Sequence, residues 1–167
     1  MSKLRAAAGK GSSFQDAPVQ EKKEIPLAER SALGRALTEG SWITTVELIP
    51  PIGTDLTRII ERSSELKKKG ILGINLPDGP RASSRISVAI TAIEIERKAG
   101  IETIPHICCR DKNLIGIQAE LLGSHAAGLR NLLIITGDPP KVGNYPDVTG
   151  VFDVDSIGLI TLAKRLN

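Results

Sequence analysis

Residues 131–140 read NLLIITGDPP, an apolar run that ends in a glycine, an aspartate and two prolines. The run NLLIIT (131–136) has the length and composition of a buried strand, and the prolines cannot continue a hydrogen-bonded ladder. Similar runs precede it, namely IETIPHICC (101–109), ILGINL (71–76) and the β-rich WITTVELIP (42–50). These strands begin about 30 residues apart, the size of one strand–helix–strand unit. The spacing therefore predicts an α/β fold with a parallel sheet covered by helices.

Helical periodicity fills the intervals between the predicted strands. Glycines follow these segments where C-caps are expected, as at Gly40, Gly70 and Gly100. A further helical segment precedes the first strand and begins after Pro26. The predicted helices cover residues 27–40, 54–69, 87–100, 113–128 and 153–167.

Four such units fit two architectures. One is a doubly wound domain of the flavodoxin type, and the other is the first half of a (β/α)8 barrel, whose full length is about 250 residues. The chain has 167 residues and lacks both G-x-G-x-x-G and G-x-x-x-x-G-K-[ST]. Composition leaves both architectures open.

Composition restricts the function classes. The 22 Lys and Arg residues against 19 Asp and Glu give a net charge of +3, and aromatic residues make up 2% of the chain. So small a basic excess with so few rings argues against a nucleic-acid partner. No apolar run approaches the roughly 20 residues that cross a bilayer, and the N-terminus has no signal-peptide core, so no membrane partner is expected.

The first 25 residues are predicted to form a disordered tail, because they are rich in Ala, Gly, Ser, Gln and Lys. Residues 26–167 are predicted to form the folded part of the chain. The two cysteines, Cys108 and Cys109, are adjacent and suggest no disulfide framework. A reducing, cytoplasmic location is therefore expected.

Each predicted strand carries one polar residue near its C-terminal end: Glu47, Asn75, His106 and, just past the fourth strand, Asp138. Side chains at the carboxyl ends of parallel strands face the functional site of an α/β fold. Any one of them alone could simply satisfy a loop amide. Four at regular spacing predict a functional site at one rim.

Local sequence suggests roles for two of these positions. Glu47 lies between Val46 and Leu48, and apolar surroundings would raise the pKa of its carboxyl group, as suits a general acid. Gly137 would give Asp138 a flexible approach and let the backbone close on a planar ligand. A simple tight turn is the alternative for this Gly-Asp-Pro segment.

A metal site is not expected. Strand alternation places His106 and Cys108 on one face and Cys109 on the other, which leaves fewer ligands than a zinc site uses. The cysteines are expected to be buried and inert, and His125 to be a packing residue inside a helix. The loop RDKN (110–113) either caps the next helix through Asp111 or contacts a ligand.

Several longer motifs resemble the methylenetetrahydrofolate reductase family, most closely its bacterial form and the reductase part of homocysteine methyltransferase fusions. The resemblance covers residues 42–167 and implies the N-terminal half of a (β/α)8 TIM barrel. It further implies FAD as cofactor and NAD(P)H as reductant of 5,10-methylenetetrahydrofolate, which becomes 5-methyltetrahydrofolate. The motifs are ELIPP (47–51), PHICCRDKN (105–113), LLGSHAAGLRNLLIITGDPP (121–140) and GNYPDVTGVFDVDSIGLI (143–160).

The resemblance also implies residue roles. Glu47 matches the family's acid that helps to open the folate's five-membered ring, and Asp138 matches the aspartate beside flavin and folate. His106 and Gly137 match positions at the flavin site. The remaining cofactor-binding positions implied are Asn75 and Thr136 at the flavin, and Asp155 and Ser156 on its phosphate and adenosine side.

Two of these positions depart from the common family pattern. Many members have threonine in place of Asn75 and arginine in place of Thr136, although threonine also occurs in the fused bacterial branch. Half of the expected barrel lies outside this sequence. Alternatives are a non-catalytic half barrel that acts as a partner subunit and a flavin-free, folate-binding TIM-barrel protein of methyl-group metabolism. Unpaired sheet edges would favour self-association or a homo-oligomer.

Overall fold

The structure is a computed structural model that describes residues 24–166. The predicted tail (1–25) therefore lies outside the described residues except for Glu24 and Ile25. Within the described residues, no helix is long and apolar enough to cross a membrane.

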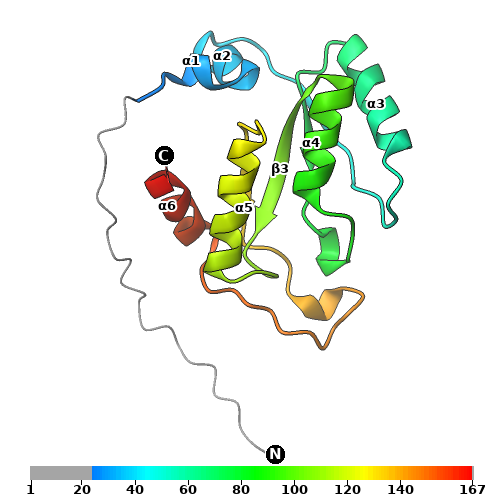
Figure 1. Ribbon diagram of the computed structural model, residues 1–167, viewed down its shortest axis with the longest axis vertical. Helices are drawn as coiled ribbons and strands as arrows, with labels where there is room; N and C mark the ends of the chain where they lie inside the picture. Colours follow the sequence, from blue (N-terminus) through cyan, green and yellow to red (C-terminus); the bar gives the residue numbers. More distant parts are fainter. Residues whose placement is uncertain (1–23, 167) are drawn as a thin grey trace, which may run out of the picture.

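Four strands alternate with helices in the order predicted from the sequence (Figure 1). Two short helices precede the first strand, and two 3-10 turns lie in the loops that follow β2 and β4. The elements are α1 (Leu27–Arg30), α2 (Ala32–Thr38), β1 (Thr45–Glu47), α3 (Thr57–Lys68), β2 (Gly73–Leu76), η1 (Pro80–Ala82), α4 (Val88–Ala99), β3 (Glu102–Cys108), α5 (Leu114–Ala126), β4 (Leu133–Ile135), η2 (Pro140–Val142) and α6 (Ser156–Leu166).

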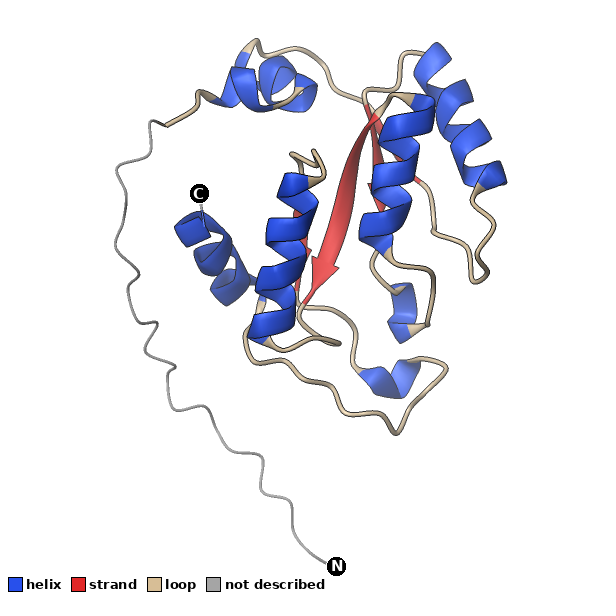
Figure 2. Ribbon diagram, in the orientation of Figure 1, coloured by secondary structure: helices blue, strands red, loops and turns tan. Residues whose placement is uncertain are grey.

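The strands form one parallel sheet in the order β1-β2-β3-β4 (Figure 2). Each strand thus lies beside the next strand in the sequence. A doubly wound sheet instead reverses its strand order at a switch point. The sequential order is that of a (β/α)8 barrel, and it decides between the two predicted architectures in favour of four units of a barrel.

All the large helices pack on one face of the sheet. Ile74 and Leu76 of β2 join a core with residues of α3 and α4, and both side chains are fully buried. Ile107 of β3 and the following Cys109 join a second core with residues of α5 and α6. The strand register places these four side chains on the same face. The other face of the sheet, which is the inner face of a barrel, carries the alternate residues.

Several element boundaries differ from the predictions. The segment predicted as one helix over 27–40 is two, because Ser31 is extended and its hydroxyl accepts a hydrogen bond from the Gly34 N–H as an N-cap. The first strand forms a ladder over three residues rather than over 42–50. The expected C-cap glycines are confirmed, with φ values of +67° at Gly40 and +64° at Gly100.

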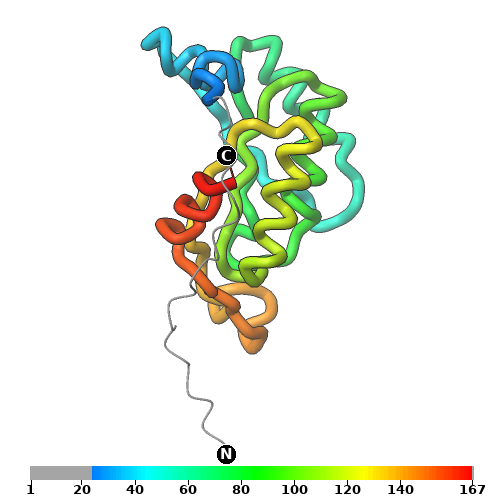
Figure 3. Tube along the Cα trace, turned by 60° about the vertical axis from the view of Figure 1, so that its left-hand side comes forward, coloured from blue at the N-terminus to red at the C-terminus, as the bar shows by residue number. Residues whose placement is uncertain are grey.

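The short N-terminal helices mark the end of the sheet opposite to the strand-end loops (Figures 1 and 3). The Glu102 carboxylate at the start of β3 accepts hydrogen bonds from the N–H groups of Ala32 (2.5 Å) and Leu33 (3.1 Å). An acidic group at a helix N-terminus is favourable both for the free N–H groups and for the helix dipole. These contacts attach α2 to the amino end of the sheet and leave the carboxyl end for the site.

Candidate functional site

Three of the four predicted strand-end residues come together on the inner face of the sheet. Glu47 and Asn75 are register partners on β1 and β2. The Asn75 side-chain amide donates to the Thr45 hydroxyl (2.8 Å), and its oxygen lies 3.4 Å from the His106 Nε2 on β3. Neighbouring strands therefore present a carboxylate, an amide and an imidazole side by side.

The surroundings of Glu47 differ from the prediction. Its side chain is exposed, whereas the neighbouring Leu48 packs against the helix-side core. Strand alternation explains this, because residues on either side of Glu47 in the sequence face the opposite side of the sheet. The apolar neighbours expected from the sequence are thus not around the Glu47 carboxylate within the described part of the chain.

His106 is a buried imidazole whose pKa is influenced by two carboxylates. Burial lowers its pKa, and the negative charges of Glu47 and Asp78 oppose that shift only in part. Because the pKa is lowered from an ordinary value near 6.5, the ring is neutral at physiological pH. A neutral ring offers one donor and one acceptor nitrogen to its neighbours.

Asp138 lies at the same end of the sheet but is held by a loop. Its carboxylate accepts a hydrogen bond from the Arg81 N–H (3.0 Å), in the loop after β2. The preceding Gly137 has φ +96°, and a Cβ there would lie 3.0 Å from the Cys108 Cβ. The turn after β4 thus needs glycine for its conformation and for its packing.

The remaining predicted cofactor residues meet at the start of α6. The Thr136 hydroxyl accepts from the Ser156 N–H (3.1 Å), and the Asp155 carboxylate accepts from the Gly158 N–H (2.8 Å). Asp155 is therefore the N-cap of α6, which explains why the helix begins at Ser156 rather than at residue 153. These contacts bring Thr136 and Ser156 together beside Gly137.

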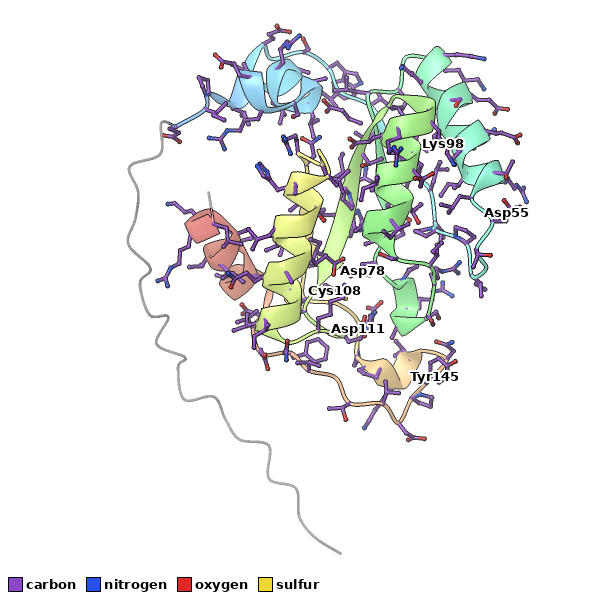
Figure 4. The ribbon with its side chains drawn as sticks, viewed as in Figure 1. Asp55, Asp78, Lys98, Cys108, Asp111 and Tyr145 are labelled. Carbon is purple, nitrogen blue, oxygen red and sulfur yellow. The ribbon has the colours of Figure 1, made fainter. Side chains whose placement is uncertain are left out.

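Two charged residues at the carboxyl ends of the strands, Asp78 and Arg110, were not identified from the sequence. Asp78, after β2, lies beside Cys108 (Figure 4) and accepts a hydrogen bond from the Cys108 N–H (3.1 Å). Arg110, after β3, is only 4% exposed. For the RDKN loop (110–113), contact with a ligand stays a prediction, whereas the alternative that Asp111 caps the next helix is wrong. Instead Asp111 pairs with Arg110, and Asn113 caps α5 by accepting from the Gly116 N–H. An Asp next to an Arg carries no local pattern that distinguishes these roles.

The two cysteines are buried, as predicted. The prediction that His125 is a packing residue is wrong, because its side chain is exposed. Cys108 and Cys109 are 2% and 0% exposed, whereas His125 lies exposed near the end of α5 and accepts from Arg130 through its backbone carbonyl. Within residues 24–166, no three His, Cys, Asp or Glu side chains are grouped as a metal ion would require.

The Cys108 thiol is expected to resist alkylation. Burial, reinforced by the negative charge of Asp78, raises its pKa to about 12. Since the thiolate is the nucleophile, iodoacetamide at about pH 8 should label native Cys108 at least ~100-fold more slowly than an ordinary free cysteine. Mass spectrometry of the labelled peptide measures the rate, with the urea-unfolded chain as control. Equal labelling of folded and unfolded chain would contradict this assignment.

Comparison with known proteins identifies the family of this chain. The sequence profile of the family described as methylenetetrahydrofolate reductase matches residues 32–163, from α2 into α6. A 5,10-methylenetetrahydrofolate reductase of Pectobacterium carotovorum subsp. carotovorum is 28% identical over 129 residues. The aligned region makes up 72% of this chain and 41% of that relative, so the chain spans less than half of the relative's length. The family match over most of the sequence and the barrel-like sheet lead to one conclusion. The chain belongs to the methylenetetrahydrofolate reductase family.

Proposed function

We propose that this chain forms the N-terminal part of a flavin-dependent enzyme that reduces 5,10-methylenetetrahydrofolate to 5-methyltetrahydrofolate. FAD would be the cofactor and NAD(P)H the reductant. The observation that carries the proposal is the grouping of Glu47, Asn75 and His106 on the inner face of the sheet, in a chain of this family.

The residues present fit a flavin. A flavin ring carries donors and acceptors along one edge, and the side chains of Asn75 and His106 supply complementary groups. Gly137 offers backbone without a side chain, and the N-terminus of α6 is favourable for phosphate. The residues proposed to hold FAD are Asn75, His106, Thr136, Gly137, Asp138, Asp155 and Ser156. When bound, FAD would supply the hydride-transfer chemistry.

Glu47 and Asp138 are the acidic groups that we assign to the folate. Both side chains are exposed, so a substrate on the inner face can reach them. Glu47 would donate a proton to a folate nitrogen as the five-membered ring opens. Asp138, held by the Arg81 N–H, would place a fixed negative charge beside the folate. His106 stays neutral and would act by hydrogen bonding.

Self-association is the proposed state of this chain. Within the described residues, the outer edges of β1 and β4 have no strand partner, and unpaired edges favour pairing with another chain. A second copy or another barrel half would supply that partner. Light scattering during size-exclusion chromatography would measure the mass, and a monomer at all concentrations would contradict the proposal. We further propose a cytoplasmic location, consistent with the two free thiols.

Flavin binding tests the proposed function. The purified chain, supplied with FAD and then desalted, is expected to keep visible flavin absorption that NAD(P)H bleaches without oxygen. His106→Ala should weaken FAD binding about 10-fold or more, equivalent to about 1.4 kcal/mol. His125→Ala is the matched control, since that exposed histidine lies near the far end of α5, and its affinity should equal wild type.

A colourless wild-type chain would contradict the flavin assignment. Retention of 5-methyltetrahydrofolate by that colourless chain would favour a flavin-free folate protein. Binding of neither compound would favour a non-catalytic half barrel that acts as a partner subunit.

A further inference from the structure

Arg110 is a buried cation among the loops at the carboxyl ends of the strands. Its side chain is 5% exposed, and it forms a fork with Asp111, in which Nε and Nη2 each donate to one carboxylate oxygen at 2.7 Å. The hydrogen bond to the Asp111 carboxylate is the main reason why the pKa of the guanidinium is raised, so the group stays charged. Burying such a charge is costly unless it is paired, and the fork supplies that pairing.

The other donors of the guanidinium reach two further loops. Nη2 also lies 3.3 Å from the Gly79 carbonyl after β2, and Nη1 lies 3.4 Å from the Asp138 carbonyl after β4. The backbone carbonyl of Arg110 accepts from the Val151 N–H (2.8 Å). One residue after β3 therefore connects the loops after β2 and β4. We call Arg110, Asp111, Gly79 and Asp138 the Arg110 clasp.

Two glycines make room for the clasp. A Cβ on Gly79, where φ is +51°, would lie 2.7 Å from the Arg110 Nη2. A Cβ on Gly137 would lie 3.5 Å from the Arg110 Cβ as well as against Cys108. The backbone at Gly79 and at Gly137 thus limits the space around the Arg110 side chain, and the guanidinium has little freedom to move.

The loop that the clasp holds has an unfavourable backbone. Arg81 and Ala82 have φ values of +55° and +51°, a region that residues other than glycine rarely adopt. The Asp138 carboxylate binds the Arg81 N–H, and the Asn144 side chain binds the Ser84 N–H, both at 3.0 Å. Such backbone persists only where the surroundings fix it, and it concentrates at functional sites.

We infer that Arg110 is a positioning residue, which fixes the loop after β2 relative to Gly137 and Asp138 and so sets the width of the flavin and folate site. This inference rests on the proposed function. The side chain of Arg110 donates hydrogen bonds to Asp111 and to two backbone carbonyls. It acts through the Gly79 carbonyl and through the backbone of Asp138.

Arg110→Lys tests the inference, because lysine keeps the charge but cannot form the fork. Two readouts are compared on the full chain: the hydrogen-exchange rate of the Arg81 amide and the affinity for FAD. We expect exchange at Arg81 to rise about 10-fold or more, FAD to bind about 10-fold more weakly, and the core strand amides of Ile74 and Ile107 to stay unchanged.

Gly79→Ala is the second variant, since it displaces the guanidinium while residue 110 stays arginine. It should reproduce both effects. Arg62→Lys is the matched control, because that arginine lies exposed on α3 in a pair with Glu65, and neither readout should change.

Three results would overturn the inference. The first is wild-type exchange at Arg81 in Arg110→Lys, and the second is faster Arg81 exchange with unaltered FAD affinity. The third is equal acceleration at Arg81, Ile74 and Ile107, which would mean general destabilisation rather than positioning. A wild-type chain that binds no FAD would instead overturn the proposed function, and faster Arg81 exchange in Arg110→Lys would then show that the clasp is structural only.

Discussion

The Glu47→Gln variant is expected to bind FAD like wild type while it forms 5-methyltetrahydrofolate about 10²–10⁴-fold more slowly, the usual range for loss of a general acid. Glutamine keeps the size and the hydrogen-bonding capacity of the side chain but has no proton to transfer. The exposed position of Glu47 on β1 makes a folding defect unexpected, because the carboxylate is not part of either core.

The measurement is the rate of folate reduction after the flavin has been reduced. Separate measurement of flavin reduction by NAD(P)H distinguishes the two half-reactions, and only the folate half should slow. Glu61→Gln, an exposed glutamate on α3, is the control. A Glu47→Gln protein with wild-type folate turnover would show that another group supplies the proton.

The sequence was sufficient for the order of elements and for the strand-end residues. Apolar runs about 30 residues apart identified all four strands, and the same spacing placed Glu47, Asn75 and His106 at one end of the sheet. Periodicity alone could not separate a barrel from a doubly wound sheet. That decision required the strand order and the packing of every large helix on one face.

The differences from the predictions have two physical origins, namely the alternation of side chains along β1 and contacts between distant segments. Leu48 was read as a neighbour of the Glu47 carboxylate, although strand alternation turns it to the opposite face. Contact of Asp138 with a ligand stays a prediction, but the sequence did not show that its carboxylate binds the N–H of Arg81, 57 residues earlier. Arg110 meets the Gly79 carbonyl across 31 residues. Such pairs leave no local pattern in the sequence, so only the fold shows them.

The Gly137→Ala variant is expected to lower the free energy of unfolding by about 2–5 kcal/mol and to abolish retention of FAD. Two effects add. Alanine at φ +96° is strained by about 1–2 kcal/mol, and its Cβ would lie 3.0 Å from the Cys108 Cβ, where overpacking of a filled site costs roughly 1–3 kcal/mol. Urea unfolding measures the sum, provided that the slope against urea concentration is unchanged.

Gly128→Ala separates the two effects, because Gly128 has a similar φ of +104° but no atom within 4 Å of a Cβ built there. Both substitutions reduce the freedom of the unfolded chain equally, so that contribution cancels in the comparison. Gly128→Ala should therefore report the backbone strain alone, and the excess loss in Gly137→Ala should report the contact with Cys108. Equal losses in the two variants would mean that the turn before Asp138 moves away from β3 at little cost. In that case the packing of Gly137 against β3 could not be what fixes the position of Asp138.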